Sequence, residues 1–62
     1  MNIVFFSTSD VFKAEEILED ESIECKIVPT PVHGKAYCGV CIETADKWAI
    51  ELISDMEYEV VD

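Results

Sequence analysis

Two amphipathic helical patterns, separated by short β-prone runs, constrain the fold of this chain more than any other feature. The clearer pattern follows Thr44, a residue that can cap a helix. Its apolar members recur at the spacing of one helix face: Ala45, Trp48, Ala49, Leu52, Ile53 and Met56. The other pattern runs from Val11 to about Asp20, directly after a cluster of helix-capping residues at 7–10. The chain is therefore predicted to contain two helices.

Four β-prone runs surround these helices: residues 3–6, 23–28, 38–43 and 57–61. The resulting order, β-α-β-β-α-β, is typical of the ferredoxin-like α+β fold. That fold has a four-stranded antiparallel sheet of order 4-1-3-2 with two helices on one face. The first and third runs are the most apolar, as central strands should be, whereas the second and fourth carry charges, as edge strands do. With 62 residues, we expect a single domain over 1–62.

The second face of the predicted sheet has no helix to cover it. Strand alternation leaves Val4, Phe6 and Cys41 on that open face. A contiguous apolar patch on so small a protein commonly marks a partner surface, and pairing two sheets would enlarge a small core. We therefore expect a homodimer through the open sheet face.

The chain is strongly acidic, with a formal net charge of -10 from 14 acidic residues and four lysines. Such a surface repels phosphate backbones and anionic lipid, so binding to nucleic acid or to a membrane is not expected. The acidity either keeps the protein soluble or steers it to a basic patch on a partner. Residues 1–6 lack the basic start and longer apolar run of a signal peptide, which predicts a cytoplasmic protein.

Three cysteines in a reducing compartment indicate buried thiols, metal ligands or reactive thiols rather than a disulfide scaffold. Cys25 alternates with apolar neighbours and is predicted to be a small core residue. Cys38 differs, because the topology brings it to one rim of the sheet with the 7–10 turn and the 29–37 loop. The start of a helix at that rim favours a thiolate over a thiol. Cys38 is thus the candidate reactive cysteine, and Gly39 after it indicates a bulge or a close backbone approach.

The residues around Cys38 in the sequence allow more than one interpretation of their roles. Cys41 completes a C-x-x-C, but along a strand the two thiols point to opposite faces, so Cys41 is either packing on the open face or a resolving thiol. His33 could give Cys38 a proton or be a polar loop residue, and Tyr37 is either a lid or a strand-edge aromatic. Three cysteines and His33 make a nominal zinc set, but ligands on two faces of a sheet cannot form a tetrahedron. We expect neither a metal nor a cofactor.

The sequence also resembles a family of small bacterial and archaeal domains named selenium/sulfur carrier proteins. The resemblance lies in Ser7, Thr8 and Asp10 after the first strand, a Pro-x-Pro at 29–31, and a Cys-Gly at 38–39, seven residues beyond the second proline. Val32 departs from the pattern, since the family usually has an arginine there, and Cys41 departs too, since a small or apolar residue is usual.

The resemblance implies a carrier rather than a true enzyme. Cys38 as thiolate would accept sulfur or selenium from a donor protein, hold it as a persulfide or perselenide, and pass it to an acceptor enzyme. Ser7, Thr8, Gly39 and His33 would bind the carried atom. Two other readings are a non-catalytic ferredoxin-like interaction module, with Cys38 structural, and a C-x-x-C thiol redox protein.

Overall fold

The computed structural model describes residues 1–31 and 37–61, and these form two helices and four strands in the order expected from the sequence. The bounds are β1 Asn2–Val4, α1 Thr8–Asp20, β2 Lys26–Pro29, β3 Val40–Glu43, α2 Trp48–Leu52 and β4 Glu59–Val61. No helix in this part of the chain has the length and apolarity that a membrane-spanning helix needs.

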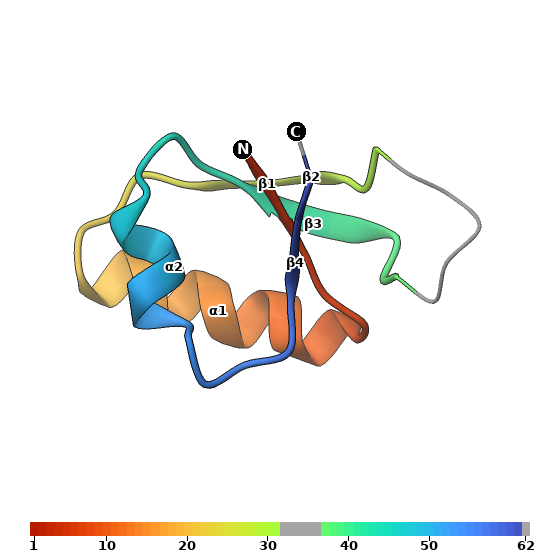
Figure 1. Ribbon diagram of the computed structural model, residues 1–62, viewed down its shortest axis with the longest axis horizontal. Coiled ribbons are helices and arrows are strands. Elements are labelled where there is room, and N and C mark those ends of the chain that lie inside the picture. The colour runs from red at the N-terminus through yellow and green to blue at the C-terminus, as the bar shows by residue number, and fades with distance from the viewer. Residues whose placement is uncertain (32–36, 62) are drawn as a thin grey trace.

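All four strands form one antiparallel sheet of order β2-β3-β1-β4, which confirms the predicted 4-1-3-2 arrangement. The register places Ile42 of β3 opposite both Ile3 of β1 and Ile27 of β2. Both helices lie on one side of the sheet (Figure 1), and this apolar row packs in the same core cluster as residues of α1 and α2. Charged residues on β2 and β4, Lys26 and Glu59, are exposed at the edges.

The core lies between the sheet and the two helices and has contributions from every layer. Its buried residues are Ile3, Phe5, Val11, Ala14, Leu18, Ile23, Ile42, Ala49 and Ile53. Those from α1 recur at helical spacing, as the amphipathic pattern predicts. Cys25 and Cys38 are partly buried and pack against this cluster from opposite ends of the sheet.

Both ends of α1 are fixed by local hydrogen bonds. Ser7 is the N-cap, with an extended backbone and a hydroxyl that accepts from the Asp10 amide at 3.3 Å. At the other end Ser22 takes a left-handed conformation, with φ 59°. The Ile23 amide then donates to the Leu18 carbonyl at 2.9 Å, which is the hydrogen bond of a Schellman termination. Glycine is the usual residue at such a position, so serine carries a conformational cost.

The second helix is shorter than its apolar pattern suggested. Thr44 does not cap it: its hydroxyl donates to the Glu24 carbonyl at 2.8 Å and accepts from the Asp46 amide at 3.2 Å. The Asp46 carboxylate in turn accepts from the Trp48 amide at 2.9 Å, and the helix begins at Trp48, three residues later than a Thr44 cap would place it. Trp48 consequently lies outside the core and is 56% exposed.

The helix-free face is not the open apolar patch predicted from strand alternation. Val4 and Cys41, which pair with one another on this face, are fully buried, and Phe6 is the exposed member of the expected patch. Tyr37 lies across the end of the face, with its ring 5.5 Å from that of Phe6 and its hydroxyl donating to the Glu59 carboxylate. Tyr37 therefore lies outside β3, and its hydroxyl links the segment before that strand to β4.

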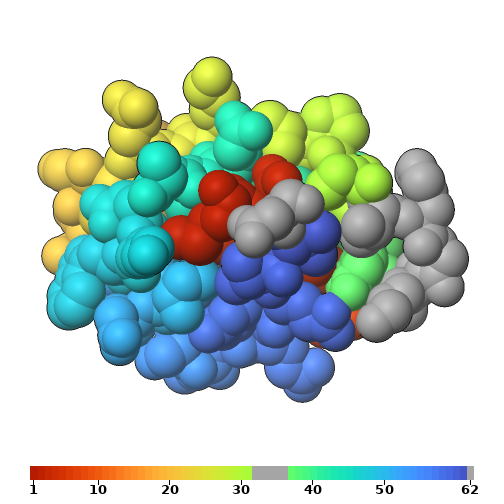
Figure 2. Space-filling model, turned by 45° about the horizontal axis from the view of Figure 1, so that its top comes forward, coloured from red at the N-terminus to blue at the C-terminus, as the bar shows by residue number. Residues whose placement is uncertain are grey.

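Figure 2 turns this side toward the viewer and shows the start of the chain and β4 side by side at its centre, with α1 almost entirely hidden. The ends of this face carry polar or charged side chains, among them Lys26 and Glu43. The helix-free face therefore exposes less apolar surface for a homodimer than the sequence indicated. The dimer stays a prediction.

Candidate functional site

A slip in strand pairing brings Cys38 to the start of α1. β1 and β3 pair with Val4 opposite Cys41, and the same register carried to the rim would place Ser7 opposite Cys38. Instead, the Cys38 amide donates a 2.7 Å hydrogen bond to the carbonyl of Phe5. The pairing is thus displaced by two residues, and the chain ahead of β3 bends toward β1 and the helix that follows it.

Thr30 fixes the peptide that follows Cys38. Its hydroxyl donates to the Cys38 carbonyl at 2.6 Å, and its amide donates to the Gly39 carbonyl at 3.0 Å. Because Pro29 and Pro31 have no amide hydrogen, Thr30 provides the one backbone donor of this three-residue run. Sequence analysis missed this role, and the signal was the threonine held between two prolines.

Gly39 lies at a bend just before β3, and the structure does not show the close backbone approach expected there. A Cβ added at Gly39 would meet no described atom within 4 Å. Packing around this position therefore does not require glycine.

The central contact of the site joins Cys38 to the first residue of α1. Cys38 Sγ lies 3.0 Å from Thr8 Oγ1, although the two residues are thirty positions apart in the sequence. The pKa of the Cys38 thiol is lowered, mainly because the Thr8 hydroxyl can donate to the thiolate. The amides of Val40 and Gly39 act in the same direction, and partial burial opposes them. Cys38 is therefore a half-buried thiol surrounded by donors that favour its charged form.

The other residues predicted to bind the carried atom are placed differently. Ser7 is exposed, and its hydroxyl caps α1 and lies 3.3 Å from Ser9 Oγ. The described contacts of this hydroxyl thus stabilise the first turn of the helix. Gly39 contributes its amide to the surroundings of the Cys38 thiol. His33 lies outside the described residues.

Cys41 has the opposite environment from Cys38. It is fully buried, and its Sγ lies 4.0 Å from Asn2 Oδ1 and 3.9 Å from the Pro29 carbonyl oxygen. Burial raises the pKa of the Cys41 thiol, and the Glu43 carboxylate acts in the same direction. At neutral pH such a thiol is a poor nucleophile.

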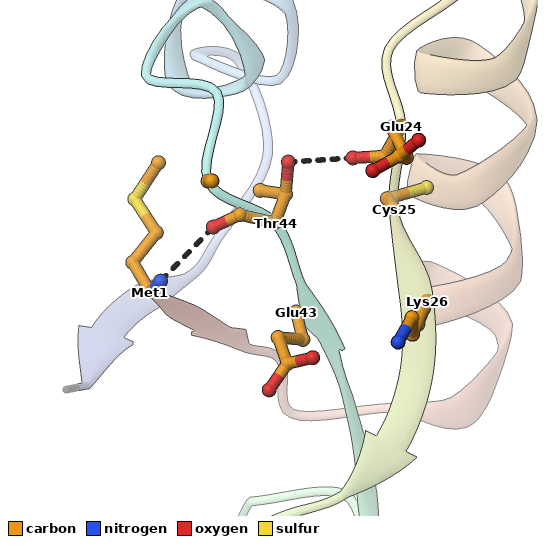
Figure 3. A pocket seen from close by; sticks show the side chains of 7 residues that line it. Met1, Glu24, Cys25, Lys26, Glu43 and Thr44 are labelled. Atoms are coloured by element: carbon orange, nitrogen blue, oxygen red, sulfur yellow. Dashed lines mark hydrogen bonds between the residues drawn. The ribbon is translucent and has the colours of Figure 1, made fainter.

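A hollow of about 320 Å³ lies at the opposite end of the sheet from Cys38 (Figure 3). There the Met1 ammonium donates to the Thr44 carbonyl at 2.9 Å, and the Thr44 hydroxyl reaches the Glu24 carbonyl. The thiol in its lining is that of Cys25, whose pKa is raised by burial and then by the nearby Glu15 carboxylate. The hollow therefore lacks the activated thiol that marks the other rim.

Among the residues that the structure describes, no group of three or more histidine, cysteine, aspartate or glutamate side chains is arranged to hold an ion.

Comparison with known families agrees with the geometry around Cys38. The family described as "Putative Se/S carrier protein-like" matches residues 2–59, which include Thr8, Thr30 and Cys38. The chain belongs to this family. Neither the curated proteins nor the solved structures gave a match to the chain. Membership in the Se/S carrier family thus comes with a cysteine whose surroundings favour the thiolate.

Proposed function

We propose that this chain is a ferredoxin-like sulfur or selenium carrier in which the Cys38 thiolate holds the carried atom. The observation that carries the proposal is the 3.0 Å contact between Cys38 Sγ and Thr8 Oγ1 at the start of α1, together with the lowered pKa of that thiol. The family to which the chain belongs supports the same function. The proposal places the protein in the cytoplasm, where thiols stay reduced.

The chemistry requires only the thiolate and a persulfide donor. The Cys38 thiolate attacks the outer sulfur of the donor persulfide, the sulfur-sulfur bond of the donor breaks, and the donor thiolate leaves. Cys38 then carries the persulfide, whose proton comes with the transferred sulfur, and no further oxidant or reductant is consumed. Delivery repeats these steps with an acceptor thiolate as the nucleophile. A perselenide forms by the same bond changes, with selenium as the transferred atom.

Local geometry gives Thr8 and Thr30 separate roles in this proposal. The Thr8 hydroxyl donates to the Cys38 thiolate and, after loading, lies beside the terminal atom. Thr30 holds the Cys38 carbonyl, which keeps the thiol directed toward α1. Thr30 is therefore a positioning residue.

A C-x-x-C redox function has less support from the structure. Cys41 is buried on the helix-free face with a raised pKa, whereas Cys38 packs on the helix side with a lowered pKa. A non-catalytic interaction module does not require the donors gathered around Cys38. The carrier reading accounts for them.

Mass spectrometry of the loaded protein tests the proposal. The purified chain is incubated with a cysteine desulfurase and cysteine, and its intact mass is compared with those of Cys38→Ser and Cys25→Ser. We expect one added sulfur on the wild type and on Cys25→Ser, and none on Cys38→Ser. Selenocysteine in place of cysteine tests selenium in the same assay. Equal loading of all three cysteines would show that Cys38 is not a dedicated site.

A further inference from the structure

The outward side of α1 next to Cys38 combines an aromatic residue with carboxylates. Thr8, Phe12, Glu15 and Glu19 recur at i, i+4, i+7 and i+11, which places them along one flank of the helix. Glu16 lies beside them and is exposed. We name these five residues the α1 flank. It begins at Thr8, in contact with Cys38 Sγ, and runs for roughly 16 Å at 1.5 Å per residue.

Phe12 makes the first turn of the α1 flank apolar. Its side chain is 53% exposed, although phenylalanine gains more from burial than most residues. Helical side chains lean toward the N-terminus, so Phe12 covers the surface between its own backbone and Thr8. Phe6 and Tyr37 are in ring contact on the other side of the rim, and Phe6 is 41% exposed. Exposed aromatic surface is therefore found one turn along α1 from Thr8, and also in the Phe6–Tyr37 pair, of which Tyr37 directly precedes Cys38 in the chain.

Beyond Phe12 the α1 flank carries only negative charge. Glu15, Glu16 and Glu19 follow one another along it, and Lys13, the lysine of this helix, lies at the margin of the flank, three residues before Glu16. The net charge of -10 adds to the local field. A surface of this kind attracts a partner with lysine or arginine at its rim, and it repels nucleic acid, anionic lipid and a second copy of this chain.

We infer that the α1 flank is the docking surface for a sulfur-donating enzyme whose active-site mouth is apolar and bordered by basic residues. The inference rests on the proposed carrier function. Phe12 enters the mouth and aligns Cys38 with the donor persulfide, while the three glutamates meet the basic border. Peripheral charges of this kind act mainly on the rate of association, and the carrier can still leave once loaded.

The test compares two routes of loading Cys38. One is transfer from the cysteine desulfurase encoded in the same genome, and the other is sodium polysulfide, which needs no docking surface. The test variants are Phe12→Ala and the double variant Glu16→Lys with Glu19→Lys. Their matched controls are Trp48→Ala, an equally exposed aromatic on α2, and Glu51→Lys with Asp55→Lys, which changes the net charge by the same amount. Circular dichroism checks that every variant folds.

We expect both α1-flank variants to slow loading from the desulfurase about fivefold or more, the effect of losing an important contact, and to leave polysulfide loading unchanged. Transfer from the desulfurase should also slow as salt increases in the wild type, and less so in the charge-reversal variant. If Cys38 loads normally but both test variants match the wild type, or the controls slow transfer equally, the docking surface is wrong and the carrier function stands. If neither route loads Cys38, the carrier function fails and the inference with it.

Discussion

Thr8→Val tests directly what makes Cys38 reactive. The change removes the hydroxyl that lies 3.0 Å from Cys38 Sγ and keeps a β-branched side chain at the first position of α1. A hydrogen bond to a charged group contributes roughly 1.5–3 kcal/mol, and water at this half-buried rim reduces the value to about 1 kcal/mol. At about 1.4 kcal/mol for each factor of ten, the ionisation constant of the Cys38 thiol should fall about fivefold, and the thiolate fraction falls by the same factor at any pH below the pKa of both thiols.

The observed reaction rate should change less than the thiolate fraction. A thiolate with a higher pKa is more nucleophilic, with a Brønsted coefficient of about 0.4–0.5, so alkylation of Cys38 at pH 7 should slow about two- to threefold. At a pH where both thiols are fully ionised, the order should reverse and the variant should react about twofold faster. Iodoacetamide labelling from pH 5 to 11, followed by peptide mass spectrometry, resolves each cysteine separately.

The control for this experiment is Ser9→Ala, which removes an exposed hydroxyl from the same turn without touching Cys38. It should leave the pH profile unchanged. Equal rates for the wild type and Thr8→Val at every pH would refute the role assigned to the Thr8 hydroxyl.

Three further substitutions test the surroundings of the site and the fold. Thr30→Val removes the hydroxyl that donates to the Cys38 carbonyl, and it should lower the free energy of unfolding in urea by about 1–2 kcal/mol. An unchanged midpoint of urea unfolding would contradict the role of this hydrogen bond. Cys41→Ala should cost about 1 kcal/mol of stability and leave sulfur loading of Cys38 intact, whereas lost loading in a folded protein would favour a dithiol mechanism. Ser22→Gly should raise the free energy of unfolding by about 0.5–1 kcal/mol, because glycine takes the left-handed conformation without steric cost but loses more chain entropy; a destabilised variant would contradict this explanation.

The order of the elements and of the strands could be predicted because local and global patterns agree. Two helical periodicities and four β-prone runs predicted the element order, and the apolar central runs agreed with the strand order of the topology that this order indicates. The meeting of Thr8 with Cys38 followed from that topology, since the end of β1 and the start of β3 share one rim.

Other features depended on contacts that no local pattern records. The burial of Val4 and Cys41 is set by tertiary contacts, among them those of Cys41 Sγ with Asn2 and with the Pro29 carbonyl. The late start of α2 depends on the Thr44 hydroxyl donating to the Glu24 carbonyl of another segment. The role of Thr30 depends on the two-residue slip in strand pairing, which is a property of the folded backbone.

Two electrostatic effects of opposite sign act on Cys38, and their ranges decide which prevails. The net charge of -10 disfavours another negative charge on the protein, but water and salt screen it beyond about 8 Å at physiological ionic strength. The Thr8 hydroxyl acts at 3.0 Å, well inside that distance, and the pKa of the Cys38 thiol is accordingly lowered despite the acidic surface. The acidity of α1 can therefore attract a basic partner without suppressing the thiolate that the partner has to reach.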